Sequence, residues 1–180
     1  MGLVIANCKY AGGVPYNVFK KLYDTIVWPV IGYGAAVWGY RSFACINAVH
    51  HRAMRFFLGV GKYTPNAALV GEMAWLPPVV RQWKAVISYW ATICNTDQSR
   101  LTKRVAIWAN SKSSTACKNW FFNIRNKLDE CNLSMYNDLA NPAPKKHLVD
   151  IVGNASMDSY IAGWYDSINK ITGIRNTGKK

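Results

Sequence analysis

The sequence predicts a mainly α fold, organised as a helical bundle of about five to seven helices with a helical C-terminal extension. Apolar residues recur at spacings of three and four along most of the chain, which is the pattern of helices that bury one side. No strand pattern competes convincingly with these helical stripes, and no repeat of fixed period is visible. With 180 residues, 51% of them hydrophobic, the chain can bury about one domain's core.

The first predicted helix is followed by an unusually apolar stretch. Residues 18–27 place apolar side chains on one side, and Pro29 is expected to kink or end this helix. Residues 30–38 are apolar all round, so we expect them to be deeply buried. Their glycines allow either a close helix contact or a turn.

A second helix is expected to begin at an N-cap, Ser42, and to run to Val60 with one apolar side. Its opposite side combines small residues and basic residues, which would let a phosphate backbone come close. These residues are Ala44, Ala48, His51, Arg52 and Arg55. Thr64 and Pro65 predict the start of a short helix that ends near Gly71.

Four further helices are predicted in the rest of the chain. Pro77 and Pro78 open one whose buried stripe runs from Trp83 to Cys94, with Arg81 and Lys84 on the other side. A loop follows at residues 95–99. The next helix is indicated by a stripe of Leu101, Val105 and Trp108, and it bears Arg100, Lys103 and Arg104. The last two stripes lie in residues 117–128 and 157–168.

The connectors favour a division into two domains. Residues 111–115 form a polar connector, so we expect a domain at residues 1–110 and a helical extension at residues 111–180. Residues 141–146 are expected to form a proline-containing linker within the extension. The tail at residues 173–180 is expected to be disordered.

The charge balance favours a polyanionic partner. Lys and Arg number 22 against 9 Asp and Glu, which gives a formal net charge of +13. Such an excess promotes binding to nucleic acid through counterion release, although membrane-surface proteins share it.

Nothing in the sequence predicts export or membrane insertion. The five cysteines are far apart and odd in number, which argues against a disulfide framework. Lys9 interrupts the short apolar stretch before it could serve as a signal peptide. The longest uncharged segment, residues 25–40, is shorter than the ~20 residues a spanning helix needs. We therefore expect an intracellular protein, either nuclear or cytoplasmic.

Catalytic and metal-binding patterns are not found. The acidic residues are scattered singly, and Asp129 and Glu130 point apart on a helix because they are adjacent. His50 and His51 are consecutive, so they cannot share one face of a helix as metal ligands. No cysteine is marked as an activated nucleophile that could pair with His147. We expect neither an enzyme nor a cofactor, a metal or a small-molecule substrate.

Aromatic residues could stack on unpaired bases, but those at stripe positions are expected to be core residues. They are Trp83, Trp90, Trp120 and Trp164. The basic residues on the opposite faces are the better candidates for function.

Three stretches resemble the region after the polymerase palm in non-LTR (LINE-like) retrotransposon reverse transcriptases. Residues 21–39, KLYDTIVWPVIGYGAAVWG, are similar to a Leu-Tyr helix followed by Pro-Val-x-x-Tyr-Gly-x-x-x-Trp. Residues 46–60, INAVHHRAMRFFLGV, look like the family's next helix, which ends in Leu-Gly. Residues 62–72, KYTPNAALVGE, resemble its Thr-Pro-Asn-Ala-Ala segment and are the most specific stretch. Weaker similarity extends to residues 83–108, 120–133 and 164–180.

The resemblance implies a thumb-like bundle with a connector, without the fingers and without the palm that carries the Tyr-x-Asp-Asp carboxylates. It also implies a catalytically inactive fragment that holds a DNA or RNA–DNA hybrid duplex by its backbone, without sequence preference. The residues expected to contact phosphates are His51, Arg52 and Arg55 first, then Lys62, Arg81 and Lys84. Two alternatives remain open: a protein-interaction or self-association module, motivated by residues 30–38, and a non-functional remnant of a decayed mobile element.

Overall fold

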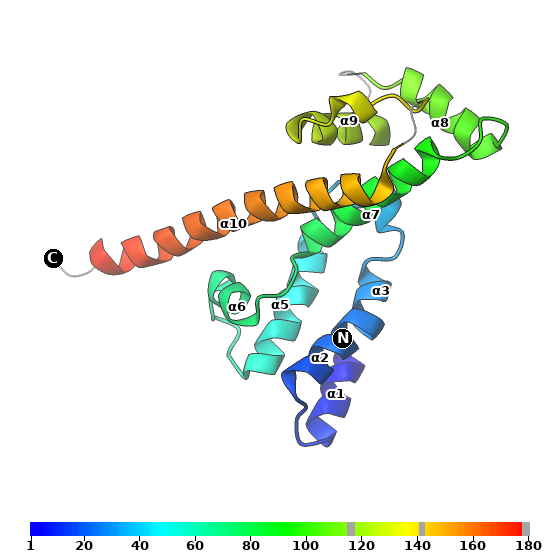
Figure 1. Cartoon of the computed structure of the whole chain (residues 1–180). Coiled ribbons are helices and arrows are strands. Elements are labelled where there is room, and N and C mark those ends of the chain that lie inside the picture. Colours follow the sequence, from blue (N-terminus) through cyan, green and yellow to red (C-terminus); the bar gives the residue numbers. More distant parts are fainter. Residues whose placement is uncertain (115–117, 141–142, 178–180) are drawn as a thin grey trace. The chain divides into compact units, whose positions relative to one another are not determined.

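The structure is all-α in the part that the computed structural model describes, which is residues 1–114, 118–140 and 143–177, with side chains as far as residue 171. Within these residues there is no β-strand, so the predicted mainly α class is confirmed (Figure 1). The described part has eight helices of seven or more residues, against the five to seven expected. The unpredicted one is α1 (Gly2–Tyr10), whose only buried side chains are Val4 and Cys8. Two buried positions are too few for a recognisable stripe.

The chain divides into two compact units that interleave along the sequence. Unit 1 comprises Met1–Tyr33, Phe43–Pro78 and Ile161–Lys180, and unit 2 comprises Gly34–Ser42 and Val79–Tyr160. This division by contacts differs from the one expected at residues 110 and 111, which stays a prediction. Each unit is described separately.

In unit 1, the helical stretch that contains Pro29 is continuous, although Pro29 was expected to kink or end it. The α-helix α2 (Tyr16–Leu22) runs into a π-helical turn, η1 (Tyr23–Val27), and then into α3 (Trp28–Ile31). Pro29 has no backbone N–H to donate, and its ring would clash with a carbonyl of the preceding α-helical turn. The wider π turn just before Pro29 relieves this conflict, so the helix continues to Ile31.

The expectation that residues 30–38 are deeply buried was wrong. Val30 is 74% exposed, Tyr33 is 84% exposed and Val37 is 61% exposed, whereas Ala35 is buried. The reason is that the stretch is not one helix. It turns at residues 32–34, where Gly34 has a φ of 70°, and continues as the short α4 (Ala35–Trp38). Of the two arrangements left open by the sequence, the turn is the one observed.

The remainder of unit 1 contains the helix α5 (Ala44–Leu58) and, beside it, α6 (Asn66–Met73) (Figure 1). Both begin later than expected: Phe43 rather than Ser42 precedes α5, and Pro65 rather than Thr64 precedes α6. The helix α5 ends at Gly59, whose φ of 65° suits a residue without a Cβ. The core of unit 1 is aromatic and aliphatic. Its most deeply buried members include Phe19, Tyr23, Met54, Leu69 and Trp75.

Unit 2 is centred on the helix α7 (Pro78–Cys94), which begins where the prolines predicted. Its stripe is buried as expected, with Val86, Ile87 and Trp90 fully inaccessible. These side chains pack with those of α9 (Trp120–Glu130) and of the first part of α10 (Lys145–Thr177). The Asn95 side chain bonds the Ala143 backbone in both directions, at 2.7 and 3.2 Å, which fixes the chain just before α10.

The helix α8 (Leu101–Ser111) exists as predicted, but its orientation was predicted wrongly. Leu101 is 72% exposed, Val105 is 52% exposed and Trp108 is 64% exposed. The buried residues of α8 are Lys103 and Ala106. The apolar stripe of this helix therefore faces away from the core, and a lysine faces into it.

The helix α10 is longer than expected because it includes part of the predicted linker and part of the predicted tail. It begins at Lys145 and continues to Thr177, while residues 141–142 and 178–180 lie outside the described residues. In the described part of the chain, no helix, α10 included, is both long enough and apolar enough to span a bilayer.

Candidate functional site

The outward side of α5 presents small residues and one fully available cation. Cys45, Ala48 and Arg52 are exposed at spacings of three and four, so they lie along one face of the helix. The opposite side buries Ile46, Ala53 and Met54. Of the residues that the sequence predicted on this side, Ala44, Ala48 and Arg52 are exposed, whereas His51 and Arg55 are partly buried. The small side chains leave the helix backbone open to close approach.

The loop between α5 and α6 adds a second exposed cation. Lys62 lies on the surface, with its Nζ 4.9 Å from the centroid of the neighbouring Tyr63 ring. Tyr63 is itself 87% exposed. An ammonium group in this position interacts weakly with the ring face and stays open to solvent and to anions.

Arg55 has a structural role that the sequence did not indicate. Its Nη2 donates to the Thr64 carbonyl oxygen at 3.0 Å and to Asn66 Oδ1 at 2.6 Å. The guanidinium thus ties the end of α5 to the start of α6, and it holds the intervening loop that carries Lys62. Arg55 is less available for a phosphate than Arg52.

His51 is half-buried, and its charge state differs from that of its neighbours. Burial lowers the pKa of the His51 imidazole below its ordinary value of 6.5, and the nearby Arg55 cation lowers it further. His51 is therefore neutral at pH 7 and contributes hydrogen bonding rather than charge.

The adjacent His50 belongs to the core of unit 1. It is 2% exposed, and its Nδ1 lies 2.8 Å from the hydroxyl of Tyr23. Both rings pack near the indole of Trp75. His50 therefore has a packing role.

The two remaining candidates, Arg81 and Lys84, lie on α7 in unit 2, and both are partly buried. The Lys84 side chain passes over Gly153 of α10 so closely that a Cβ at Gly153 would collide with its Cε. The structure thus gathers His51, Arg52, Arg55 and Lys62 in unit 1 and places Arg81 and Lys84 in unit 2. Lys84 also has a packing role against α10.

Two cations of unit 2 donate to backbone carbonyl groups and are not part of any predicted site. The Lys103 side chain is 1% exposed, and its Nζ donates to the carbonyl oxygens of Ile93, at 3.0 Å, and Cys94, at 2.8 Å, and to that of Leu139. The Arg125 Nη2 donates to the carbonyl oxygen of Ser113 at 3.1 Å. The carbonyl groups of Ile93, Cys94 and Ser113 lie at or just beyond helix ends, where intrahelical donors are lacking.

Two thiols in the described part of the chain, those of Cys94 and Cys131, have a raised pKa. Burial raises the pKa of Cys94 to about 11, against the smaller lowering effect of Lys103, and burial also raises the pKa of Cys131. Both are protonated at neutral pH and therefore poor nucleophiles. Among the described residues, no group of three or more His, Cys, Asp and Glu side chains is placed to hold a metal ion.

The tryptophans expected at core positions are buried to different degrees. Trp90 is fully buried, whereas Trp83, Trp120 and Trp164 are partly exposed. The indole N–H of Trp120 donates to the Ala36 carbonyl oxygen at 3.1 Å, and that of Trp164 to the Ala67 carbonyl oxygen at 2.7 Å. These indoles join separate segments within one unit, which is a packing role.

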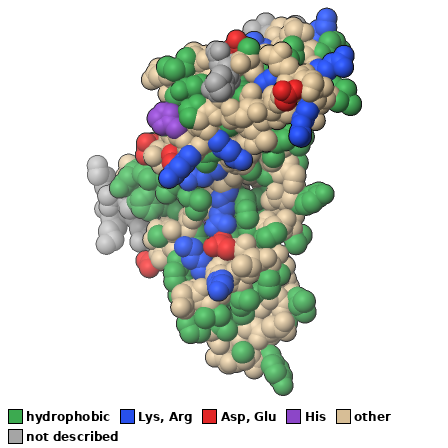
Figure 2. Space-filling view, turned by 45° about the vertical axis from the view of Figure 1, so that its right-hand side comes forward, with side chains coloured by type: hydrophobic (Ala, Val, Ile, Leu, Met, Phe, Trp, Pro, Cys, Tyr) green, Lys and Arg blue, Asp and Glu red, His purple; other side chains and the backbone are tan. Residues whose placement is uncertain are grey.

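Both units contribute to the positive charge of the chain. Unit 1 contains ten Lys and Arg residues against three acidic ones, and unit 2 contains twelve against six. Figure 2 shows one face of the molecule, where Lys and Arg side chains lie among exposed hydrophobic ones. Comparisons with protein-family models, with curated proteins and with solved structures found no match to this chain.

Proposed function

We propose that this chain is a catalytically inactive helical module that binds the backbone of duplex or hybrid nucleic acid through the outward side of α5 and the loop that follows it. The observation that carries this proposal is the pair of exposed cations, Arg52 and Lys62, in a chain with a net charge of +13. Neutralising phosphates with such side chains releases counterions from the nucleic acid. Contacts to phosphates carry no base information, so the binding is independent of sequence.

The other residues of this surface have supporting roles in the proposal. Arg55 positions the Lys62 loop through its bonds to Thr64 and Asn66. His51 offers a neutral ring that can donate a hydrogen bond at pH 7. Arg81 and Lys84 are proposed as additional phosphate contacts from α7.

The proposal includes kinship with the thumb and connector of non-LTR retrotransposon reverse transcriptases, supported by the three sequence stretches in residues 21–39, 46–60 and 62–72. The genomic sequence upstream of the Met1 codon tests this kinship. A continuous or recently broken frame encoding palm carboxylates would support it. An unrelated upstream sequence with its own promoter and an intact start would favour a stand-alone protein.

Binding is tested by measuring the anisotropy of a labelled duplex with Arg52→Ala and Lys62→Ala variants of the full chain. Each variant should weaken binding about five-fold, for a contact worth about 1 kcal/mol. Both positions are exposed, so neither change should unfold the protein.

The matched control for these variants is Lys9→Ala, which removes the same charge from an exposed position on α1. It should change the affinity by less than about two-fold. If Lys9→Ala weakens binding as much as the other two, net charge alone is responsible and the assigned surface is wrong. If all three variants bind as the wild type does, the proposal is wrong.

A second candidate function, self-association, is favoured by the apolar side chains that unit 1 exposes along residues 16–31. Val18 is 42% exposed, Ile26 is 50% exposed and Val30 is 74% exposed. Exposed apolar area of this kind promotes association when it is contiguous. Sedimentation of the wild type and of Val30→Asp tests it: a dimer that the substitution converts to monomer supports self-association, and a monomeric wild type contradicts it.

A further inference from the structure

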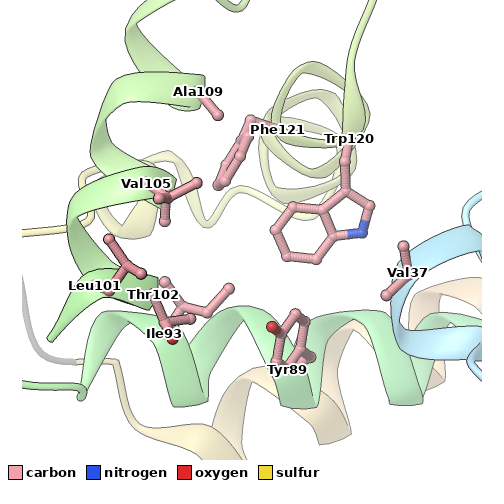
Figure 3. Close-up of a pocket in the computed structure, with 10 residues that line it drawn as sticks. Val37, Tyr89, Ile93, Leu101, Thr102, Val105, Ala109, Trp120 and Phe121 are labelled. Atoms are coloured by element: carbon pink, nitrogen blue, oxygen red, sulfur yellow. The ribbon is translucent and has the colours of Figure 1, made fainter.

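Unit 2 contains an apolar groove between three helices and one short segment (Figure 3). Its volume is about 460 Å³, within the range of roughly 300–1,000 Å³ that ligand-binding clefts occupy. Leu101 and Val105 of α8 form one wall, Tyr89 of α7 lies along another side, and Trp120 of α9 faces Val37 of α4. The groove has room for more than one large apolar side chain.

Contacts within unit 2 hold the walls of this groove in place. The Trp120 indole N–H donates to the Ala36 carbonyl oxygen at 3.1 Å, which fixes the α4 segment against α9. The Tyr89 and Trp120 rings meet edge to face, with centroids 5.8 Å apart. Phe121, which also lines the groove, is 8% exposed. The groove is therefore part of the packed structure of unit 2.

The outward stripe of α8 extends the apolar surface beside the groove. Leu101, Val105 and Trp108 follow one another at spacings of four and three, so they lie along one face of the helix. The three side chains are 72%, 52% and 64% exposed, respectively. Lys103 occupies the inward side of α8, so this stripe stays largely exposed in the described part of unit 2. A row of side chains one helical turn apart is the shape that an amphipathic helix recognises.

The charges around this surface select the occupant. Arg100, Arg104 and Lys112 are exposed at the start, middle and end of α8. The nearby carboxylate of Asp97 accepts a hydrogen bond from the Ser99 backbone N–H at 2.8 Å. Its hydrogen bonds with Ser99 lower the pKa of Asp97, and the Arg100 charge lowers it further. A second copy of this chain, with a net charge of +13, would bring like charges together at such a surface. An acidic occupant would pair with them.

We propose that this groove binds an acidic amphipathic helix of a partner protein. The apolar stripe of that helix enters the groove between Leu101, Val105 and Trp120. Acidic residues on its flanks meet Arg100, Arg104 and Lys112. The site belongs to unit 2 and does not depend on the proposed nucleic-acid binding of α5.

The test uses the full chain and a labelled synthetic peptide that carries leucines at every third and fourth position and glutamates on both flanks. Binding is followed by fluorescence anisotropy. A second peptide, with lysines in place of the glutamates, has the same apolar stripe. The glutamate peptide should bind at least ten-fold more tightly than the lysine peptide, and added salt should reduce the difference.

Three variants locate the site. Val105→Asp and Leu101→Asp each place a carboxylate on the groove wall and should weaken the binding of the glutamate peptide at least ten-fold. The matched control is Ile107→Asp on the same helix, because Ile107 is 45% exposed and does not line the groove. It should change binding less than two-fold. Two independent wall variants keep the test valid if one of them fails to fold, which circular dichroism would show.

Four outcomes would overturn the proposal. The first is equal binding of the two peptides, and the second is equal loss with Ile107→Asp and Val105→Asp. The third is a wild-type dimer that Val105→Asp dissociates, which would make a second copy the occupant. The fourth is displacement of the peptide by a single-stranded oligonucleotide together with loss of oligonucleotide binding in Val105→Asp, which would make nucleic acid the occupant. Arg52→Ala and Lys62→Ala should leave peptide binding unchanged, so failure here and failure of the nucleic-acid proposal can be told apart.

Discussion

The helices α5 and α8 have similar sequence patterns, but α5 buries its apolar side and α8 exposes its apolar stripe. Both place apolar residues at spacings of three and four and carry cations between them. In α5 the apolar side is packed and Arg52 is exposed, whereas in α8 Leu101 and Val105 are exposed and Lys103 is buried. Periodicity therefore identifies a helix but does not decide which of its sides faces the core.

The orientation of α8 is explained by the end of α7. The last carbonyl groups of an α-helix have no intrahelical donor, and leaving them unpaired in the interior is costly. Lys103 reaches two of them, at Ile93 and Cys94, and the small Ala106 on the same side of α8 allows a close approach. A buried ammonium group is tolerated because carbonyl oxygens surround it.

The largest effect is expected from breaking this arrangement with Lys103→Met. The substitution keeps the length of the side chain but leaves the carbonyl groups of Ile93, Cys94 and Leu139 without their donor. It should lower the free energy of unfolding by about 3 kcal/mol, measured by urea denaturation. The control, Arg104→Met, makes a similar change at the next, exposed position and should cost less than about 0.5 kcal/mol. Equal, small losses in the two variants would show that Lys103 does not fix the orientation of α8.

A smaller effect is expected from Arg55→Ala on α5. It removes hydrogen bonds to Thr64 and Asn66, so it should lower the free energy of unfolding by about 1 to 2 kcal/mol. The loop at residues 59–65 should also be cleaved faster by proteases. Arg52→Ala, one turn earlier and exposed, should leave stability and cleavage unchanged. Indistinguishable behaviour of the two variants would remove the distinction between a structural and an available arginine.

The helices and most of their buried sides could be predicted from the sequence because the stripes of α5, α7 and α9 are wide and regular. The sequence could not predict which side of α8 faces the core, the role of Arg55 or the burial of Lys103. They depend on carbonyl groups that come close only after folding, such as those of Cys94 and Leu139. The same limit applies to the candidate site: the sequence indicated six residues, but not that Arg55 supports the loop or that Lys84 packs over Gly153.

A smaller effect again is expected on the pH dependence of the free energy of unfolding, through His51 of α5. The pKa of His51 is lowered in the folded state, so the unfolded chain binds a proton first as the pH falls. The contribution of neutral His51 to the free energy of unfolding is therefore present above the ordinary pKa of 6.5 and is lost as the pH falls below that value. Chemical denaturation at pH 7 and pH 5 should show a smaller acid destabilisation in His51→Gln than in the wild type. An identical pH dependence in the two proteins would contradict the lowered pKa.

The smallest effect is expected from Val105→Ser on the outward stripe of α8. Because Val105 is 52% exposed, the free energy of unfolding should change by less than about 0.5 kcal/mol. The same substitution at the fully buried Val86 of α7 should cost about 2 kcal/mol or more. Similar losses at the two positions, measured by thermal or urea unfolding, would place the stripe of α8 in the core after all.

The proposed function is tested most directly by the salt dependence of duplex binding, because each phosphate contact contributes a slope of about −0.9 to log K against log salt concentration. The double variant Arg52→Ala/Lys62→Ala should bind with a slope shallower than that of the wild type by roughly 1.8. The control Lys9→Ala/Lys170→Ala, with the same net charge, should keep the wild-type slope. Equal slopes for the wild type and Arg52→Ala/Lys62→Ala would contradict the assignment of the outward side of α5 as the nucleic-acid-binding surface.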